Sequence, residues 1–293
     1  MAAQFRIVSW NIQAIRNGPV SKLAAVARAL AAHSPQVVVL QEVSARGSVA
    51  TDLQRELAAI GLVHFCFSGD PNSEEKKYGN VIASRWPLER RAWPVPTPWP
   101  QLMLAARVDY GRGPFLVVGV HIPNGSNNGW RKIDAFEALA AGLAHHDVRG
   151  PTVLAGDFNE PEAFKPKFLS WGASENGSLE GDWQRKGESF PRTRWQSAVA
   201  AVLAPRRERS ARGAWDVEHT VLQAGARFEA THIAGETTER CYDHILTTTN
   251  LFVVREVGYD HSVRQGENAV SDHSIVLVTL SPGGEQFDDD LLP

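Results

Sequence analysis

Residues 151–159, PTVLAGDFN, carry an apolar stretch directly into an aspartate and an asparagine. The run of small and β-branched side chains is typical of a buried strand. Asp157 and Asn159 therefore stand where that strand emerges. Such an aspartate often serves only as a turn former or a helix cap, because its side chain accepts hydrogen bonds from nearby backbone N–H groups. A chemical role for the pair is favoured only if polar side chains also stand at the ends of other strands.

The rest of the chain predicts many strands and few long helices. Apolar or alternating runs indicate strands at 5–10, 36–43, 63–67, 79–85, 101–110, 114–122, 226–233, 241–249, 252–259 and 273–280. Helical periodicity is found at 21–33, near 49–60 and at about 130–143. This proportion predicts two β-sheets packed face to face, with helices outside.

The length and composition favour one domain. A chain of 293 residues with 43% hydrophobic content is long enough for one large core. We expect residues 1–281 to form this domain, with an irregular Arg/Trp-rich insertion at about 171–216 and an acidic flexible tail at 282–293. The net charge of −3 gives no overall attraction to nucleic acid or acidic membranes. Any anion-binding surface must therefore be local.

Cysteine content and the N-terminus bear on the compartment. Cys66 and Cys241 are too few for a disulfide scaffold or a cysteine zinc site, and are typical of a reducing compartment. The opening MAAQFRIVSW lacks the basic region and apolar run of a signal peptide. No stretch reaches the ~20 apolar residues of a membrane span. We expect a cytoplasmic monomer that does not bind membranes.

Polar side chains stand at the ends of several other predicted strands. They are Asn11, Gln41, Glu42, His121, Asn124, Asp243, His244, Asp272 and His273. Each alone has a structural explanation, as a charge in solvent, a cap or a buried histidine with its hydrogen bonds satisfied. Together they predict a site, because ligands collect where buried strands end.

The residue types narrow the chemistry of this site. Carboxylate and amide oxygens are hard ligands that suit Mg²⁺ or Mn²⁺. The sequence has neither the clustered cysteines nor the His-x-x-x-His spacing that would indicate a zinc site. The sequence has no phosphate-binding Gly-x-x-x-x-Gly-Lys-Ser/Thr loop and no Gly-x-Ser-x-Gly elbow. His145, His146 and His244 are expected at the surface or in packing. A hard cation beside an aspartate and a histidine favours phosphoester hydrolysis by activated water.

Seven motifs occur in the order found in the endonuclease/exonuclease/phosphatase superfamily. They are SWNIQ, LQEV, GNVIASRWPL, HIPNGS, GDFN, CYDHIL and SDHSIV, which run from Ser9 to Val276 and so span nearly the whole chain. The sequence most resembles the exonuclease III and abasic-endonuclease branch. The resemblance implies a four-layered α/β sandwich, in which two packed, mostly antiparallel β-sheets are flanked by helices, with the site at one end.

The resemblance also implies the metal ligands. Glu42 becomes the principal ligand of Mg²⁺ or Mn²⁺, with Asn11 and Asp272 near the metal. Gln13 stands where many abasic endonucleases carry an aspartate near the metal. One metal ion is therefore favoured over two.

The catalytic roles follow from the same motifs. Asp157 is implied to orient and deprotonate the attacking water, and Asn159 to hold this water and the phosphate. His273 is implied to contact the phosphate and Asp243 to orient His273, while His121 stabilises charge on the transition state. Such a division places cationic groups against developing negative charge and the base opposite the leaving oxygen.

The substrate is indicated by a local concentration of charge. Between Trp183 and Trp215 lie eight arginines and lysines against two glutamates, interleaved with aromatic residues. Basic side chains bind phosphates and aromatic rings stack on unpaired bases, so the segment predicts a nucleic-acid surface. The alternative is a solvated arginine-rich loop anchored by its tryptophans. The candidate substrate-binding residues are Asn80, Asn124, Trp130, Lys132, Arg192 and Arg194.

Two departures from the branch bear on specificity. His121 stands where the branch usually carries tyrosine, and ERCYDHIL lacks the tryptophan that packs against a flipped abasic sugar. The sequence thus predicts a metal-dependent phosphodiesterase, an exonuclease III-like DNA endo/exonuclease without abasic preference. One alternative is a phosphatase or phospholipase acting on a small phosphoester. Another is an inactive nucleic-acid-binding module, which is disfavoured because all eight expected polar positions are filled.

Overall fold

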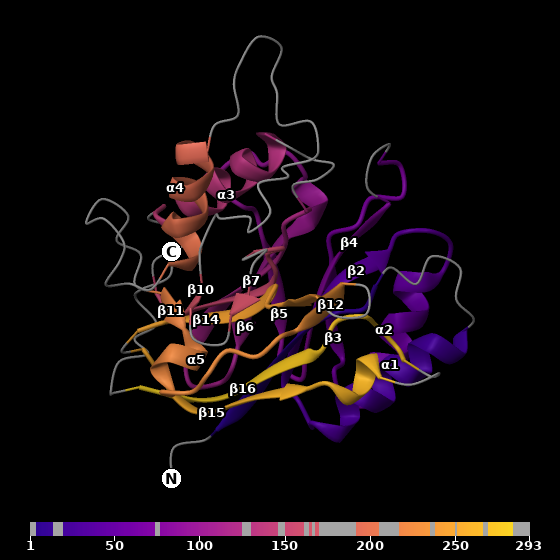
Figure 1. The fold of residues 1–293 in the computed structure, drawn as a ribbon. Coiled ribbons are helices and arrows are strands. Elements are labelled where there is room, and N and C mark those ends of the chain that lie inside the picture. Colours follow the sequence, from indigo (N-terminus) through magenta and orange to yellow (C-terminus); the bar gives the residue numbers. More distant parts are fainter. Residues whose placement is uncertain are drawn as a thin grey trace.

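Two six-stranded β-sheets lie face to face, and each contains one parallel pair of strands (Figure 1). The computed structural model describes residues 4–13, 20–73, 77–124, 130–145, 150–160, 164–165, 168–169, 192–204, 217–234, 238–249, 251–265 and 269–283. Sheet A has the order β15 (Phe252–Asp260), β16 (Ile275–Pro282), β1 (Phe5–Asn11), β2 (Val37–Ser44), β4 (Tyr78–Ser84), β3 (His64–Phe67). Sheet B has the order β11 (Val217–His219), β14 (Asp243–Thr248), β8 (Thr152–Asp157), β7 (Pro114–His121), β6 (Met103–Asp109), β5 (Leu88–Arg91).

The parallel pair is central in both sheets. It is β1 with β2 in sheet A and β7 with β8 in sheet B, whereas every other neighbouring pair in these sheets is antiparallel. The prediction of two packed, mostly antiparallel sheets is therefore confirmed.

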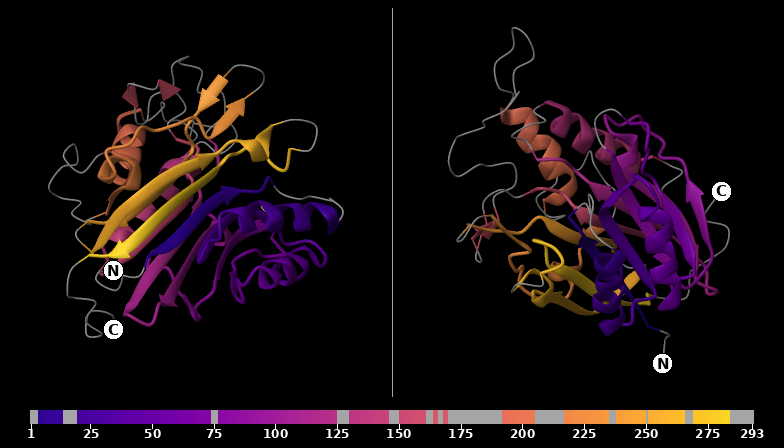
Figure 2. Two further views of the ribbon diagram at one scale, coloured as in Figure 1. Left: turned by 90° about the horizontal axis from the view of Figure 1, so that it is seen from below. Right: turned by 90° about the vertical axis from the view of Figure 1, so that its right-hand side faces the viewer.

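Helices cover the outer face of each sheet (Figure 2). Against sheet A lie α1 (Val20–Ala32) and α2 (Val49–Ala59), and against sheet B lie α3 (Trp130–Leu143) and α4 (Arg192–Leu203). The short elements are η1 (Pro100–Leu102), β9 (Phe164–Lys165), β10 (Phe168–Leu169), α5 (Thr220–Gln223), β12 (His232–Ala234), β13 (Thr238–Arg240) and η4 (Ser262–Arg264). Both β9 with β10 and β12 with β13 form two-stranded antiparallel pairs outside the main sheets.

The strand sequences explain the layers. In β2, Val37 and Val39 face the core between the sheets, whereas Val38 and Leu40 face the core beneath α1 and α2. Successive side chains of a strand point to opposite faces, so a strand covered on both sides is apolar throughout. A third apolar cluster joins sheet B to α3 and α4. Three apolar interfaces separate four layers, as the family resemblance implied.

Helix α4 corrects the prediction that about 171–216 is irregular. Trp195, Val199 and Val202 are buried and recur every three or four residues, which places them on one helical face against sheet B. Arginines at 192, 194, 206 and 207 flank this stripe, so charge dominates the segment in the sequence. The rest of that segment, like residues 284–293 of the expected tail, lies outside the described residues.

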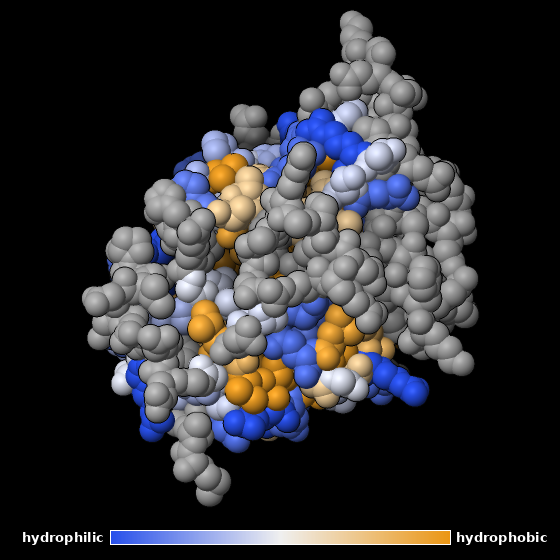
Figure 3. Space-filling view, turned by 90° about the vertical axis from the view of Figure 1, so that its left-hand side faces the viewer, coloured by the Kyte–Doolittle hydropathy of each residue, from blue (hydrophilic) through white to orange (hydrophobic). Residues whose placement is uncertain are grey.

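Apolar area at the surface is divided into separate regions. On the face drawn in Figure 3, hydrophilic side chains separate the apolar ones. The exposed large hydrophobic side chains of the described residues are Val63, Leu222, Ile233 and Val253. Within these described ranges, no helix combines the length and the hydropathy that a bilayer crossing needs.

Candidate active site

The ends of both central parallel pairs meet at one edge of the sandwich. Asn11 is the last residue of β1, and His121 and Asp157, which are register partners, are the last residues of β7 and β8. Asn11 Nδ2 lies 2.9 Å from Oδ2 of Asp157, so this hydrogen bond joins sheet A to sheet B. Polar side chains that lie far apart in the sequence thus share one site.

A bulge directs Glu42 into this site. The register of β2 against β4 shifts between Leu40 and Val43, and Glu42 has a left-handed backbone with φ of 56°. A bulge re-aims a side chain, and such a backbone costs a non-glycine residue about 1–3 kcal/mol. Glu42 Oε1 lies 3.4 Å from Nδ2 of Asn11 and 3.7 Å from Nε2 of His121. The fold therefore holds a strained residue where its carboxylate faces the site.

Each residue of the GDFN motif has a local structural cause. A Cβ atom on Gly156 would overlap the carbonyl oxygen of Val120, so only glycine fits there. Phe158 is fully buried, and Asn159 has a left-handed backbone, with φ of 48°, that asparagine tolerates. The Asn159 backbone N–H donates to Oδ1 of Asp157 at 2.8 Å. The turn thereby fixes the Asp157 carboxylate.

Asp157 is buried among groups of both charges. Burial raises the pKa of its carboxyl group, and this outweighs the opposing effect of His273. Nε2 of His121 and Nε2 of His273 lie 3.7 and 3.8 Å from Oδ2 of Asp157. A carboxylate with a raised pKa, fixed by hydrogen bonds on both oxygens, is suited to accept a proton.

His273 is a buried cation held by carboxylates. Burial alone would lower its pKa, but Asp243, Asp157 and Asp272 together raise the pKa of His273 to about 10. Its Nδ1 lies 2.8 Å from Oδ2 of Asp243, so the other ring nitrogen faces Asp157. The backbone is fixed as well, because Trp10 Nε1 donates to the His273 carbonyl at 2.9 Å.

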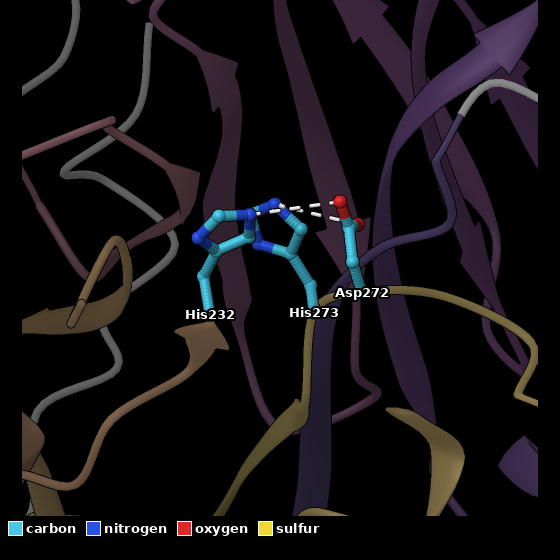
Figure 4. Close-up of side chains that lie close together, drawn as sticks. All are labelled: His232, Asp272 and His273. Carbon is cyan, nitrogen blue, oxygen red and sulfur yellow. Dashed lines mark ion pairs between the residues drawn. The ribbon is translucent and has the colours of Figure 1, made fainter. Parts of the chain in front are cut away.

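Asp272 lies at the open side of the site, next to a histidine that the sequence did not predict. Gln13 Nε2 donates to Asp272 Oδ2 at 3.0 Å, and His232 Nε2 lies 3.5 Å from the same oxygen. The rings of His232 and His273 are 4.7 Å apart, and the two residues form a β-bridge (Figure 4). No local motif marks His232, because its place depends on this pairing across the fold.

The donor atoms fit a hard divalent cation. Glu42 and Asp272 offer carboxylate oxygens, which Mg²⁺ and Mn²⁺ prefer. Asn11 links Glu42 to Asp157 through Nδ2, and its Oδ1 accepts the backbone N–H of Gln13 at 2.9 Å. Asn11 therefore organises the carboxylates in addition to lying beside them.

Two of the expected substrate-binding residues are closed off from solvent. Lys132 has no exposed side-chain surface, and its Nζ lies 2.7 Å from Glu160 Oε1 and 2.9 Å from the carbonyl oxygen of Asn159. Asn80 is buried and donates through Nδ2 to the carbonyl oxygens of Leu102 and Gly119. The prediction that these two side chains contact the substrate is therefore wrong. Both instead hold backbone carbonyl oxygens in the interior.

The other four candidates differ in how exposed their side chains are. Asn124 is exposed, three residues after His121. Trp130 is largely buried, with the guanidinium of Arg194 5.0 Å from its ring centroid. Arg194 also contacts Glu137 at 2.6 Å and Asp134 at 3.3 Å, so its charge faces two carboxylates. The side chain of Arg192 lies outside the described residues.

The sequence matches the Endonuclease/Exonuclease/phosphatase family over residues 8–273. The chain belongs to this family, whose enzymes generally depend on divalent metals.

Solved structures support the same fold. An endonuclease/exonuclease/phosphatase from Beutenbergia cavernae is 24% identical, with a TM-score of 0.63 over 96% of this chain and 72% of that one. An AP endonuclease from Archaeoglobus fulgidus is 17% identical, with a TM-score of 0.64 over 94% and 98%. A 3'-5' exonuclease from Neisseria meningitidis is 20% identical, with a TM-score of 0.61 over 95% and 100%. A comparison with curated proteins gave no match.

Proposed function

We propose that the protein is a Mg²⁺- or Mn²⁺-dependent phosphodiesterase that hydrolyses DNA, of the exonuclease III-like type. The observation that carries this proposal is the meeting of Glu42, Asp157 and His273, from both sheets, at one edge of the sandwich. Asn11 donates hydrogen bonds to both Glu42 and Asp157, and Nε2 of His273 lies 3.8 Å from Oδ2 of Asp157. Membership of a family of phosphoester hydrolases supports the same reaction class.

Each residue of the site has a distinct part in the proposed reaction. When bound at Glu42, Asn11 and Asp272, the metal ion would polarise a phosphoryl oxygen. Asp157 accepts the proton of the attacking water, because its two oxygens are fixed and burial raises its pKa.

Two imidazoles complete the proposed site. Protonated His273, oriented by Asp243, donates from Nε2 to a phosphate oxygen, and His121 faces the same space from the end of β7. Both lie beside the group on which negative charge develops, where positive charge stabilises the transition state. Lys132 supports the turn of Asn159 from behind by holding its carbonyl oxygen.

DNA is the proposed substrate for two reasons. The names of two similar structures describe an AP endonuclease and an exonuclease. Arginines also lie over aromatic rings on segments next to the site: Arg240 over Tyr242 at 5.7 Å and Arg131 over Trp99 at 5.8 Å. Both rings are buried, so the guanidinium groups are the parts of these pairs that can contact a phosphate. We further propose that the protein acts as a cytoplasmic monomer, in keeping with its two free cysteines.

The proposal is tested with a substrate panel in Mg²⁺ and in Mn²⁺. The panel contains plasmid DNA, abasic duplex, single-stranded DNA, RNA and bis-p-nitrophenyl phosphate. We expect cleavage of DNA without a large preference for the abasic duplex, and a loss of ~10²–10⁴-fold in Asp157→Asn. Asp109→Asn, an exposed aspartate at the far end of β6, is the matched control for contaminating nuclease. A small phosphoester cleaved better than any nucleic acid would favour the phosphatase alternative.

A further inference from the structure

His232, Asp272 and His273 form a group of three side chains that no step of the proposed reaction requires together. One ligand atom from each lies within 4.8 Å of the other two. The Asp272 carboxylate lies beside both histidines, with Oδ2 3.5 Å from Nε2 of His232 and Oδ1 3.9 Å from Nε2 of His273. The three side chains point toward one another from β12 and from the segment before β16 (Figure 4).

These separations suit a small tetrahedral ion. Zinc binds histidine nitrogen and carboxylate oxygen at about 2.0–2.1 Å, which places neighbouring ligand atoms of a tetrahedron about 3.3 Å apart. With one ligand atom taken from each side chain, the separations of up to 4.8 Å need to close by at most about 1.5 Å. The Asp272 and His232 side chains are 39% and 16% exposed, so an ion can reach them from solvent.

The surroundings hold two of the ligands in place. Asp243 accepts from Nδ1 of His273, which leaves Nε2 as the ligand atom, as in carboxylate–histidine–zinc arrangements. The ring of His232 stacks on Tyr242 with centroids 5.4 Å apart. Two imidazoles and one carboxylate favour zinc over Mg²⁺. The oxygen ligands proposed for the catalytic metal, from Glu42, Asn11 and Asp272, favour Mg²⁺ or Mn²⁺ instead.

We propose that His232, Asp272 and His273 bind Zn²⁺ and that this ion inhibits the enzyme. Zinc takes the lone pair of His273 Nε2 in place of the proton, which passes to solvent, so His273 can no longer donate to phosphate. The ion also engages Asp272, a proposed ligand of the catalytic metal. Zinc binding stands independently of the proposed function, whereas inhibition rests on it.

Zinc binding is measured by isothermal titration calorimetry of the full chain with ZnCl₂ in millimolar Mg²⁺. We expect the Kd of the wild type to rise at least ~10-fold in His232→Asn, since the loss of even an outer partner of a metal ligand costs 10–100-fold. The matched control is His33→Asn, which removes a partly buried histidine that pairs with Asp260 away from the site. Circular dichroism establishes that each variant is folded. An unchanged Kd in His232→Asn, or no zinc binding by the wild type, would overturn the site.

Inhibition is measured as the zinc concentration that halves the rate of DNA cleavage, with each variant normalised to its own zinc-free rate. We expect this concentration to rise in His232→Asn by the same factor as the Kd, and to stay constant in His33→Asn. Equal inhibition of the wild type and His232→Asn would refute an inhibitory role. If the protein cleaves no phosphoester, the proposed function fails, and calorimetry still decides the zinc site.

Discussion

Nδ1 of His273 lies 2.8 Å from Oδ2 of Asp243, and both side chains are buried. The pair connects the start of β14 in sheet B to the segment that leads into β16 in sheet A. Because one ring nitrogen is occupied by Asp243, the other points toward Asp157, 3.8 Å away. The orientation of the imidazole that we propose contacts the phosphate therefore depends on Asp243.

This dependence predicts strongly non-additive effects on the rate of cleavage. Asp243→Asn should lower kcat by loosening His273, and His273→Ala should lower it at least as much. The double variant should lose far less than the product of the two single losses, because the residues act as a unit. Steady-state rates of the four proteins test this. Losses that multiply would show that Asp243 does not orient His273.

The buried pair of Lys132 and Glu160 predicts an effect on stability. Both side chains have 0% exposure, and their charged atoms are 2.7 Å apart. Removing one partner leaves a buried charge uncompensated, so Lys132→Met or Glu160→Leu should each lower the free energy of unfolding by about 3–5 kcal/mol. The double variant should be more stable than either single one. Urea unfolding measures this, and a loss below ~1 kcal/mol in both single variants would contradict a paired state.

His244 predicts sensitivity to acid. Burial, reinforced by His219, lowers the pKa of His244 to about 3 in the folded state, against 6.5 for an ordinary histidine. Between pH 6.5 and 3, only the unfolded chain therefore takes up a proton at His244. The contribution of neutral His244 to the free energy of unfolding is fully present above pH 6.5 and is lost as the pH falls toward 3.

The corresponding test compares slopes of unfolding free energy against pH. The slope of the wild type should exceed that of His244→Gln by about 0.7 kcal/mol per pH unit at pH 6.5 and by close to about 1.4 at pH 5. Glutamine keeps an N–H donor for the Glu160 carbonyl, which accepts from His244 at 2.8 Å. Equal slopes would mean that His244 takes up its proton equally in the folded and unfolded states, which would contradict the lowered pKa.

Arg194 predicts a distinction between DNA binding and helix packing. Its contacts with Glu137, Asp134 and the ring of Trp130 tie α4 to α3. If it also binds phosphate, Arg194→Ala should reduce the slope of log affinity against log salt by about 0.7–0.9. If it serves packing only, the slope stays constant and the melting temperature falls. Filter binding over a range of salt, with cleavage of bis-p-nitrophenyl phosphate as the reference, separates the two.

Much of the fold could be predicted from local patterns. The continuous apolar run of β2 indicated a strand covered on both faces, and the alternation of strands and few helices indicated packed sheets. Helix α4 escaped prediction because its short apolar stripe of Trp195, Val199 and Val202 is flanked on both sides by arginine-rich sequence, which indicated an irregular charged segment. Strand β12 begins only at His232, although the apolar pattern suggested a start at 226, because its partner β13 is only three residues long.

The candidate site could be predicted as a set of residues but not as a geometry. Residue types at strand ends indicated Glu42, Asp157 and His273. Nothing in the sequence shows that Lys132 turns inward to Glu160, since a lysine on the first turn of a helix is usually solvated. His232 was missed because its approach to Asp272 results from a bridge across 41 positions of sequence.

The central claim is that cleavage of DNA needs a divalent cation bound at Glu42. The most direct measurement is the cleavage rate of an end-labelled DNA duplex in Mg²⁺ and in EDTA, for the wild type and for folded Glu42→Ala and Glu42→Gln. We expect cleavage by the wild type in Mg²⁺ only, and at least ~10²-fold slower cleavage by both variants, because the proposed role of the carboxylate is to hold the ion that would polarise the phosphate. Undiminished cleavage by the wild type in EDTA would show that no divalent cation is needed.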